Sequence, residues 1–263
     1  MRTLLSLTLL GATLGAAQAQ ASCPTTAISM FTSPGLLPPK PLLVIEHQGE
    51  LMGSDVTTQV VLAQGQTLVG VKVVRSLLGR LVRQFVVVPE RPLEDGEWVV
   101  TPRAGSAAAE ANYHHPLGTI TVDHSVSIVP PRFLTQPKSG RFDETRFGCG
   151  PETLLVFDDS ELDRDGLVEV TLRGTDFELT GFASGSTKAT ERIAVGVWMC
   201  GGAFDLPRGK TFAVTLTPVG ADGTKGPLHM VLASTPPEPP PRIYRAGDLQ
   251  RLFGLPSKLV KRR

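Results

Sequence analysis

The chain has 263 residues, of which 41% are hydrophobic and 19% are charged. This apolar content supplies enough side chains for a folded core and argues against wholesale disorder. The formal net charge of +1 disfavours both a globally basic nucleic-acid binder and a strongly acidic chain. The length suits two ordinary domains or one large β domain.

Residues 1–21 have the pattern of a secretory signal peptide. Arg2 precedes a short leucine-rich run, and small residues follow it. The run is shorter than the ~20 apolar residues that a membrane-spanning helix needs, and no later segment approaches that length. Cleavage after Ala19 or after Ala21 fits equally well. The sequence therefore predicts an exported protein, secreted or periplasmic, without a transmembrane span.

The chain has three cysteines, Cys23, Cys149 and Cys200. In an oxidising compartment this odd count predicts one disulfide and one remaining thiol. Cys149 and Cys200 fall in the same half of the chain, and we predict that they are bridged. Cys23 is free, paired within or between chains, or lipid-anchored; Gln20 stands where a lipoprotein signal prefers an apolar residue. The absence of a C-x-x-C spacing removes the basis for a zinc-ribbon or thioredoxin-like site.

The first half of the mature chain predicts antiparallel β-structure, because short β-branched runs alternate with turn residues. Gly79–Arg80 lies between two such runs and predicts a hairpin connection. The run Val86–Val88 lacks polar alternation, which predicts a central strand buried on both faces. The expected strands are Leu42–His47, Thr57–Ala63, Thr67–Arg75, Leu81–Pro89, Glu97–Thr101 and Thr119–Val129.

The second half follows a break at Pro130–Pro131 and has the same character. Val168, Val170 and Leu172 alternate with polar residues, as in a strand with one buried face. The turn Gly220–Gly223 is expected to join two strands. The expected strands are Leu154–Phe157, Leu167–Arg173, Phe177–Gly181, Arg192–Cys200, Thr211–Val219 and Leu228–Ser234.

This density of strands predicts an all-β protein with two consecutive antiparallel immunoglobulin-like β-sandwich domains, residues 22–131 and 132–235. The alternative is a single large β domain in which Pro130–Pro131 is an inter-strand loop. Residues 236–263 form a polyproline spacer and a basic tail.

Two turn motifs resemble known extracellular modules. Pro89–Val100 resembles the closing segment of bacterial immunoglobulin-like modules, in which Leu93 would fill the core, Gly96 would make the turn and Trp98 would take the place of the usual tyrosine. Thr215–Thr224 is similar to the late hairpin of fibronectin-III-like bacterial modules.

The second motif departs from its family at Gly220 and Thr224, where aspartate and asparagine are usual. The resemblance implies an extracellular sandwich used for spacing, surface assembly or binding. It implies no catalytic residue.

The C-terminal tail concentrates positive charge. Asp248 is its single acid, and removing the tail and Arg2 leaves 18 basic against 24 acidic residues, so the remaining chain is acidic. The basic residues of the tail are Arg242, Arg245, Arg251, Lys258, Lys261, Arg262 and Arg263.

Within the tail, Asp248 is placed to cap a short helix that carries Leu249, Leu252 and Phe253 on one face. Pro256 would end it. One hypothesis is that the tail is a docking or anchoring segment for an anionic surface or an acidic partner. The alternatives are a solvated tail and a tail that folds back on the acidic remainder of its own chain.

Two clusters of side chains are candidate metal-binding sites. Glu161, Asp163 and Asp165 precede Gly166 and could converge on calcium, although the full EF-hand spacing is missing; a polar hairpin turn is the alternative. His114–His115, with Asp123–His124 nearby, is the one concentration of histidines and is more typical of a surface loop.

The sequence has no G-x-S-x-G, P-loop or H-E-x-x-H motif and no basic stripe with interleaved aromatics for nucleic acid. It favours an exported non-catalytic structural, adhesive or partner-binding protein of a bacterial envelope or extracellular matrix, with a protein or glycan as partner. The alternative is an exported enzyme, such as a hydrolase, or a metal-binding protein with a site built from loops.

Overall fold

The computed structural model describes residues 26–79, 82–112, 115–147, 150–158, 160–185, 193–197 and 202–238. These residues are mostly in β-strands, as expected for an all-β protein. No helix among them is long and apolar enough to cross a membrane. The predicted signal peptide, Cys23 and the basic tail lie outside the described residues.

The N-terminal half, residues 26–129, contains short strands and three single-turn helices in its described part. Its elements are β1 (Ala27–Thr32), β2 (Leu36–Leu37), β3 (Leu43–Gln48), η1 (Gly49–Gly53), α1 (Val56–Gln59), β4 (Val60–Gln64), β5 (Thr67–Leu78), β6 (Val82–Pro89), β7 (Gly96–Pro102), α2 (Ala107–Ala111) and β8 (Gly118–Val122).

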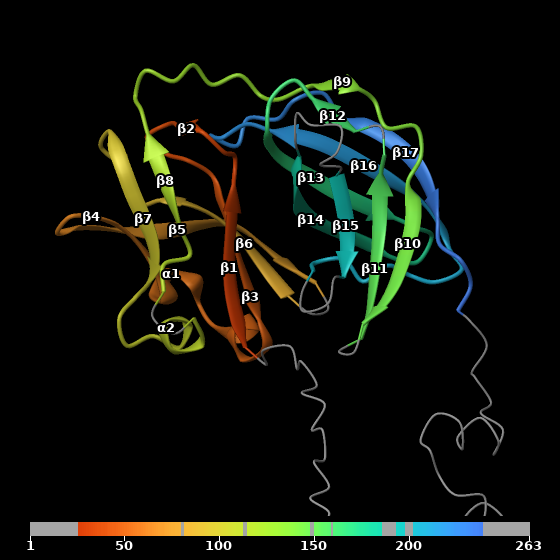
Figure 1. Cartoon of the computed structure of the whole chain (residues 1–263), viewed down its shortest axis with the longest axis horizontal. Coiled ribbons are helices and arrows are strands. Elements are labelled where there is room, and N and C mark those ends of the chain that lie inside the picture. Colours follow the sequence, from red (N-terminus) through yellow and green to blue (C-terminus); the bar gives the residue numbers. More distant parts are fainter. Residues whose placement is uncertain are drawn as a thin grey trace, which may run out of the picture.

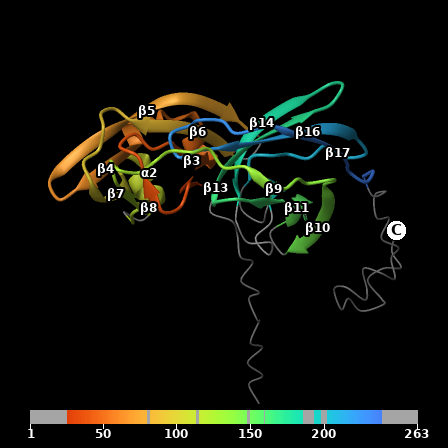
Figure 2. The same ribbon diagram turned by 90° about the horizontal axis from the view of Figure 1, so that it is seen from above.

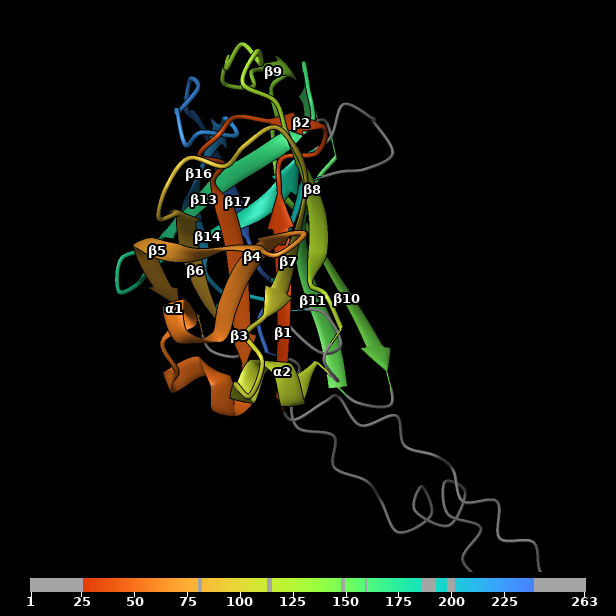
Figure 3. The same cartoon turned by 90° about the vertical axis from the view of Figure 1, so that its left-hand side faces the viewer.

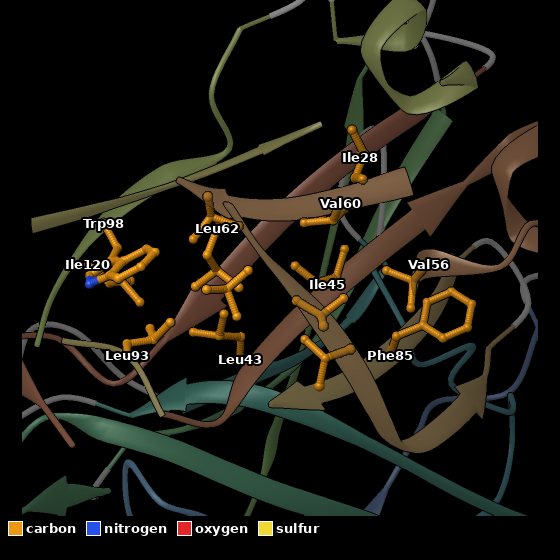
Figure 4. Close-up of a cluster of buried hydrophobic side chains, with 14 of the residues drawn as sticks. Ile28, Leu43, Ile45, Val56, Val60, Leu62, Phe85, Leu93, Trp98 and Ile120 are labelled. Carbon is orange, nitrogen blue, oxygen red and sulfur yellow. The ribbon is translucent and has the colours of Figure 1, made fainter. Parts of the chain in front are cut away.

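The strands of this half form one sheet in the order β1-β3-β6-β5-β4-β7-β8-β2. β5 is the point where the sheet bends, because its first residues pair with β4 and its later residues pair with β6. A register shift between Val73 and Arg75 increases the local bend. The bent sheet encloses a buried cluster to which β1, β3, β4, β6, β7 and β8 all contribute (Figures 1 and 4).

Two side chains of the immunoglobulin-like motif lie in this cluster. Leu93 and Trp98 are each 1% exposed, and the indole Nε1 of Trp98 donates to the carbonyl of Glu94 at 2.9 Å. Gly96 has a φ of +116°, a backbone conformation that favours glycine at this turn. Leu93 is therefore buried in the core and Gly96 lies at a turn, as expected, and Trp98 is a core residue.

Two expected strands of the N-terminal half are wrong in part. The run Thr57–Ala63 begins as helix α1, because the side chain of Asp55 accepts from the backbone N–H of Thr57 at 3.0 Å and caps that turn. The run Thr119–Val129 is a strand only as far as Val122. Directly after Val122, the carboxylate of Asp123 accepts hydrogen bonds from the backbone N–H and the hydroxyl of Ser125. This side-chain turn ends the strand.

The C-terminal half, residues 130–238, contains strands in its described part. They are β9 (Phe133–Thr135), β10 (Arg141–Phe147), β11 (Gly150–Phe157), β12 (Glu161–Leu162), β13 (Gly166–Arg173), β14 (Glu178–Gly185), β15 (Ile193–Val197), β16 (Thr211–Val219) and β17 (His229–Ser234).

Two sheets pack face to face in this half, in the orders β14-β13-β16-β17 and β10-β11-β15. Their inner faces share a second buried cluster. Val168, Val170 and Leu172 are each 0% exposed, which confirms the alternation predicted for this strand. β9 and β12 form a separate two-stranded pair beside these sheets (Figure 1).

A third buried cluster joins the two halves. Val44 of β3 and Val86 of β6 pack with Phe182 of β14, together with Leu42, Leu167 and Val219. Val44 and Val86 alternate with residues of the first cluster, and Phe182 and Leu167 adjoin residues of the second cluster, so this third cluster lies where the two sheets meet (Figure 2). Val86 and Val87 are 2% and 0% exposed on opposite faces of β6, which confirms the predicted central strand.

Candidate binding cleft

A cleft of about 440 Å³ opens where the two halves meet. Four connections border it. They are Ser33–Gly35 between β1 and β2, with Leu36 at the start of β2, residues 126–131 between β8 and β9, Asp163–Asp165 between β12 and β13, and Gly220–Ala221 after β16. The connection from β8 to β9 runs over the top of the molecule in Figure 1 and is seen from another side in Figure 3.

Hydrogen bonds between the halves and within the C-terminal half hold these connections in place. The N–H of Leu42 donates to the carbonyl of Ala221 at 2.7 Å. Arg132 and Asp163 are joined twice, because the Arg132 N–H donates to Asp163 Oδ1 at 2.9 Å and the Asp163 N–H donates to the Arg132 carbonyl at 2.9 Å. The border of the cleft is therefore fixed by both halves of the chain.

Pro131 packs against glycines of the C-terminal half. A Cβ at Gly166 would lie 2.8 Å from the Pro131 ring, and a Cβ at Gly226 would overlap the Pro131 carbonyl oxygen. The Pro130–Pro131 break is thus packed onto the C-terminal half. The domain boundary expected at residue 131 stays a prediction.

Aliphatic side chains give the cleft its chemical character. Leu36, Ile128 and Val129 are 53%, 37% and 40% exposed, which is unusual for three large aliphatic residues around one cavity. The hydroxyl of Ser33 is buried and has no hydrogen-bond partner among the described residues. A second cavity of about 340 Å³ shares Ser33–Leu36 and extends along β8.

A buried polar cluster lies between the halves, outside the cleft. The side-chain amide of Gln84, which is 1% exposed, donates to the carbonyl of Phe182 at 3.1 Å and accepts from the Phe182 N–H at 2.7 Å. The same Nε2 donates to Glu46 at 2.8 Å. Burial raises the pKa of the Glu46 carboxyl, and the hydrogen bonds from Gln84 and Ser29 oppose this shift only in part.

An ion-pair cluster crosses the same interface. Glu169 of β13 accepts from Arg75 of β5 at 2.9 Å and from Lys225 at 3.0 Å. The Glu169 side chain is 13% exposed, while its two partners are about half exposed. The interface therefore combines apolar packing, a buried amide and charge pairing, and it fixes the two sheets relative to each other.

The structure gives the candidate calcium residues other contacts. Glu161 is in β12 and lies opposite Thr135. Asp163 holds Arg132 as described above and also lies 3.5 Å from the guanidinium of Arg164. Asp165 lines the cleft. Among the described residues, no group of three or more His, Cys, Asp or Glu side chains is arranged to hold a metal ion.

The remaining predicted site residues are only partly described. Cys149, Cys200, His114 and all seven basic tail residues lie outside the described residues. His124 is exposed and pairs with Asp95, its Nδ1 lying 2.5 Å from Oδ1. This hydrogen bond raises the pKa of His124 and lowers the pKa of Asp95.

Sequence reasoning missed the cleft itself. Its lining comes from four connections far apart in the chain. Two of them carry residues of predicted motifs, Asp163–Asp165 of the candidate calcium cluster and Gly220–Ala221 of the predicted turn, but neither motif indicates a cleft. One local signal was present, the aliphatic residues Ile128 and Val129 directly before Pro130–Pro131. The sequence pattern predicts that this run ends a strand, whereas in the structure it borders the cleft.

No protein-family model matches this chain, and no curated protein matches it. Among solved structures it is similar to pullulanase type I from Bacillus subtilis str. 168 complexed with maltose, with 9% identity and a TM-score of 0.24 over 79% of this chain. It spans only 24% of that chain. It is also similar to the fibronectin(III)-like modules of CbhA from Clostridium thermocellum, with 9% identity and a TM-score of 0.21, covering 82% of this chain and 97% of that chain. With TM-scores this low, neither likeness assigns a fold family or a function.

Proposed function

We propose that the protein is an exported, non-catalytic, partner-binding component of a bacterial envelope or extracellular matrix. We further propose that the cleft between its halves is the binding surface. The observation that carries the proposal is the exposure of Leu36, Ile128 and Val129 around one cavity. Burying such aliphatic surface is favourable by about 25 cal/mol per Å², which favours a partner that fills the cleft, after the costs of association are met.

The charged groups of the cleft support binding over catalysis. Asp163 already accepts a backbone hydrogen bond from Arg132 and pairs with Arg164. Both contacts engage this carboxylate in holding its own connection. Asp163, Arg164 and Asp165 instead form a polar rim beside the aliphatic residues, which is the usual arrangement of a binding interface.

The chemistry of the lining favours a polypeptide as the partner. Among the described residues that border the cleft, the large apolar side chains are aliphatic and none is aromatic. Sugar rings are bound preferentially on aromatic faces, whereas aliphatic side chains pack well against Leu, Ile and Val. The partner we propose is a polypeptide segment with aliphatic side chains.

The test is capture of a partner from an envelope extract by the mature full-length chain. The variant Leu36→Asp/Ile128→Asp puts two charges into the cleft at exposed positions, so the fold should persist. The matched control is Leu68→Asp, because Leu68 is 60% exposed on β5 and does not border the cleft. Circular dichroism and thermal melting check the fold of each variant.

We expect the cleft variant to lose the captured polypeptide while the control retains it. A chain that ends at Glu238 is compared in parallel, because capture that depends on the tail alone would place the binding surface elsewhere. Equal capture by the wild type and the cleft variant would contradict the proposal.

A further inference from the structure

Strand β17 carries a row of exposed aliphatic side chains. Met230 and Leu232 are 60% and 69% exposed, and Leu228, directly before the strand, is 64% exposed. The alternate residues Val231 and Ala233 point into the core and are 6% and 3% exposed. Leu228, Met230 and Leu232 are called the β17 row below. Because side chains two residues apart share one face of a strand, the row is a continuous apolar strip.

The row lies on an edge strand without the usual protection. β17 is the last strand of its sheet and pairs only with β16. Natural edge strands carry charges, prolines or bulges that prevent pairing with other chains. β10, at the edge of the facing sheet, has charged residues such as Arg141 and Asp143. β14, at the opposite edge, is covered at Phe182 by the amide of Gln84, whereas β17 has none of these features.

The chain leaves the fold beside this strand in a fixed position. The N–H of Thr235 donates to the carbonyl of Lys210 at 3.0 Å, and the N–H of Gly209 donates to the carbonyl of Pro236 at 2.9 Å. The hydroxyl of Thr235 also donates to the carbonyl of Pro207. These contacts hold the start of the proline spacer against the β15–β16 connection, at the end of β17.

We propose that the C-terminal segment, residues 242–263, folds back and covers the β17 row. The segment contains the apolar residues Leu249, Leu252 and Phe253 at helical spacing. From Glu238 to Leu249 the extended chain spans up to roughly 36 Å. The row itself is about 13 Å long and lies beside the exit point, so the segment reaches it with chain to spare.

Charge supports the same occupant. The segment carries seven basic residues and one acid, whereas the rest of the chain without Arg2 has 24 acids and 18 basic residues. Opposite net charges draw the segment towards its own fold. The apolar contact then fixes where it docks, and the β17 row is covered.

Limited trypsin digestion of the mature full-length chain tests this inference, because the segment is rich in cleavage sites. The variant Met230→Ser/Leu232→Ser removes the apolar contact at exposed positions. The matched control is Leu68→Ser/Val74→Ser, two aliphatic residues of β5 that are 60% and 61% exposed. Mass spectrometry measures the rate of cleavage after Arg251, and sedimentation velocity measures the oligomeric state.

We expect the row variant to be cut on the order of tenfold faster than the wild type, since cleavage follows the population of the undocked segment. The control should be cut at the wild-type rate, and the rates should not depend on protein concentration. Equal rates for wild type and row variant would overturn the inference. Protection that grows with concentration and accompanies a dimer would also overturn it, by assigning the row to a second copy. The cleft shares no residue with the β17 row, so each proposal fails or stands separately.

Discussion

At the scale of single residues, glycines of the C-terminal half determine how closely Pro131 approaches. Gly226 donates its N–H to the carbonyl of Pro218 at 2.8 Å, and the Pro131 carbonyl oxygen occupies the space where a Cβ at position 226 would lie. Because that neighbour is backbone, a rotamer change cannot relieve the overlap.

Gly226→Ala should therefore destabilise the protein by about 1–3 kcal/mol, the usual cost of overpacking. Urea unfolding followed by circular dichroism measures it. Gly53→Ala is the matched control, because a Cβ at Gly53 meets nothing within 4 Å, and it should be neutral. If the two variants lose equal stability, the close approach of Pro131 is not what constrains position 226.

Two neighbouring residues of β3, Glu46 and His47, contribute to folding stability with opposite dependences on pH. Burial raises the pKa of Glu46, so the folded state holds this proton more tightly than the unfolded state does. Stability from Glu46 is greatest at acid pH and is lost as pH rises from 4.5 through the raised value. Burial lowers the pKa of His47, so its contribution is present above 6.5 and is lost as pH falls through the lowered value.

Glu46→Gln isolates the first of these effects. The amide stays neutral, accepts from Gln84 and cannot ionise, so the variant should be more stable than the wild type at pH 8. The advantage should shrink towards pH 4.5, where the unfolded carboxyl also becomes protonated. Urea unfolding at several pH values measures this difference, and an advantage that does not vary with pH would refute the assignment to Glu46.

At the scale of elements, strand pairing brings together the segments that flank two cysteines. β11 pairs antiparallel with β15, with Thr153 opposite Val197. Cys149 directly precedes β11, and Cys200 follows β15 by three residues. The described ends of β11 and β15 that are nearest to these cysteines in sequence therefore lie at the same end of one strand pair. The Cys149–Cys200 bridge stays a prediction.

Peptide mapping of the non-reduced protein should find Cys149 linked to Cys200, with Cys23 outside that bridge. Cys149→Ser/Cys200→Ser should then lower stability by about 4 kcal/mol, the loop-closure term for a loop of this length, and reduction of the wild type should have a similar effect. A Cys149–Cys23 peptide, or no change on reduction, would contradict the prediction.

The same scale explains which elements the sequence could predict. β13 and β16 were predicted to within a residue, because Val168, Val170 and Leu172 alternate with polar side chains and alternation is a local signal. α1 was missed because one Asp55 cap converts a β-branched run into a helical turn. β10 was missed because its charged sequence hides the pattern of a strand.

The candidate site was less predictable than the strands. Gln84 and Phe182 are 98 residues apart in sequence, and no local pattern marks a glutamine that will bind the backbone of another sheet. The cleft likewise depends on contacts such as Leu42 with Ala221. Such contacts form only when both halves have folded and met.

At the scale of the whole molecule, the third buried cluster couples the two halves. Phe182 is 6% exposed and packs with Val44 and Val86 of the N-terminal half. Its backbone is held by Gln84 at the same point. Apolar packing and hydrogen bonding therefore act together, and we expect the halves to unfold in a single transition.

Phe182→Ala should separate that transition into two. Truncation of a buried phenylalanine costs about 3–5 kcal/mol, and here the loss falls on the contact between the halves. Differential scanning calorimetry resolves the transitions. Leu172→Ala, a truncation inside the C-terminal core, should lower the melting temperature and keep one transition. One shared transition in both variants would mean that the cluster does not couple the halves.

The amide of Gln84 has a consequence for dissecting this protein. It occupies a hydrogen-bonding position on β14 that a neighbouring strand would otherwise take, and Phe182 is buried beside it only while the N-terminal half is present. A C-terminal half produced alone would expose both the open strand edge and the phenylalanine. Residues 130–238 expressed on their own should therefore be recovered as aggregates, so crystallographic and binding studies need a chain that retains both halves.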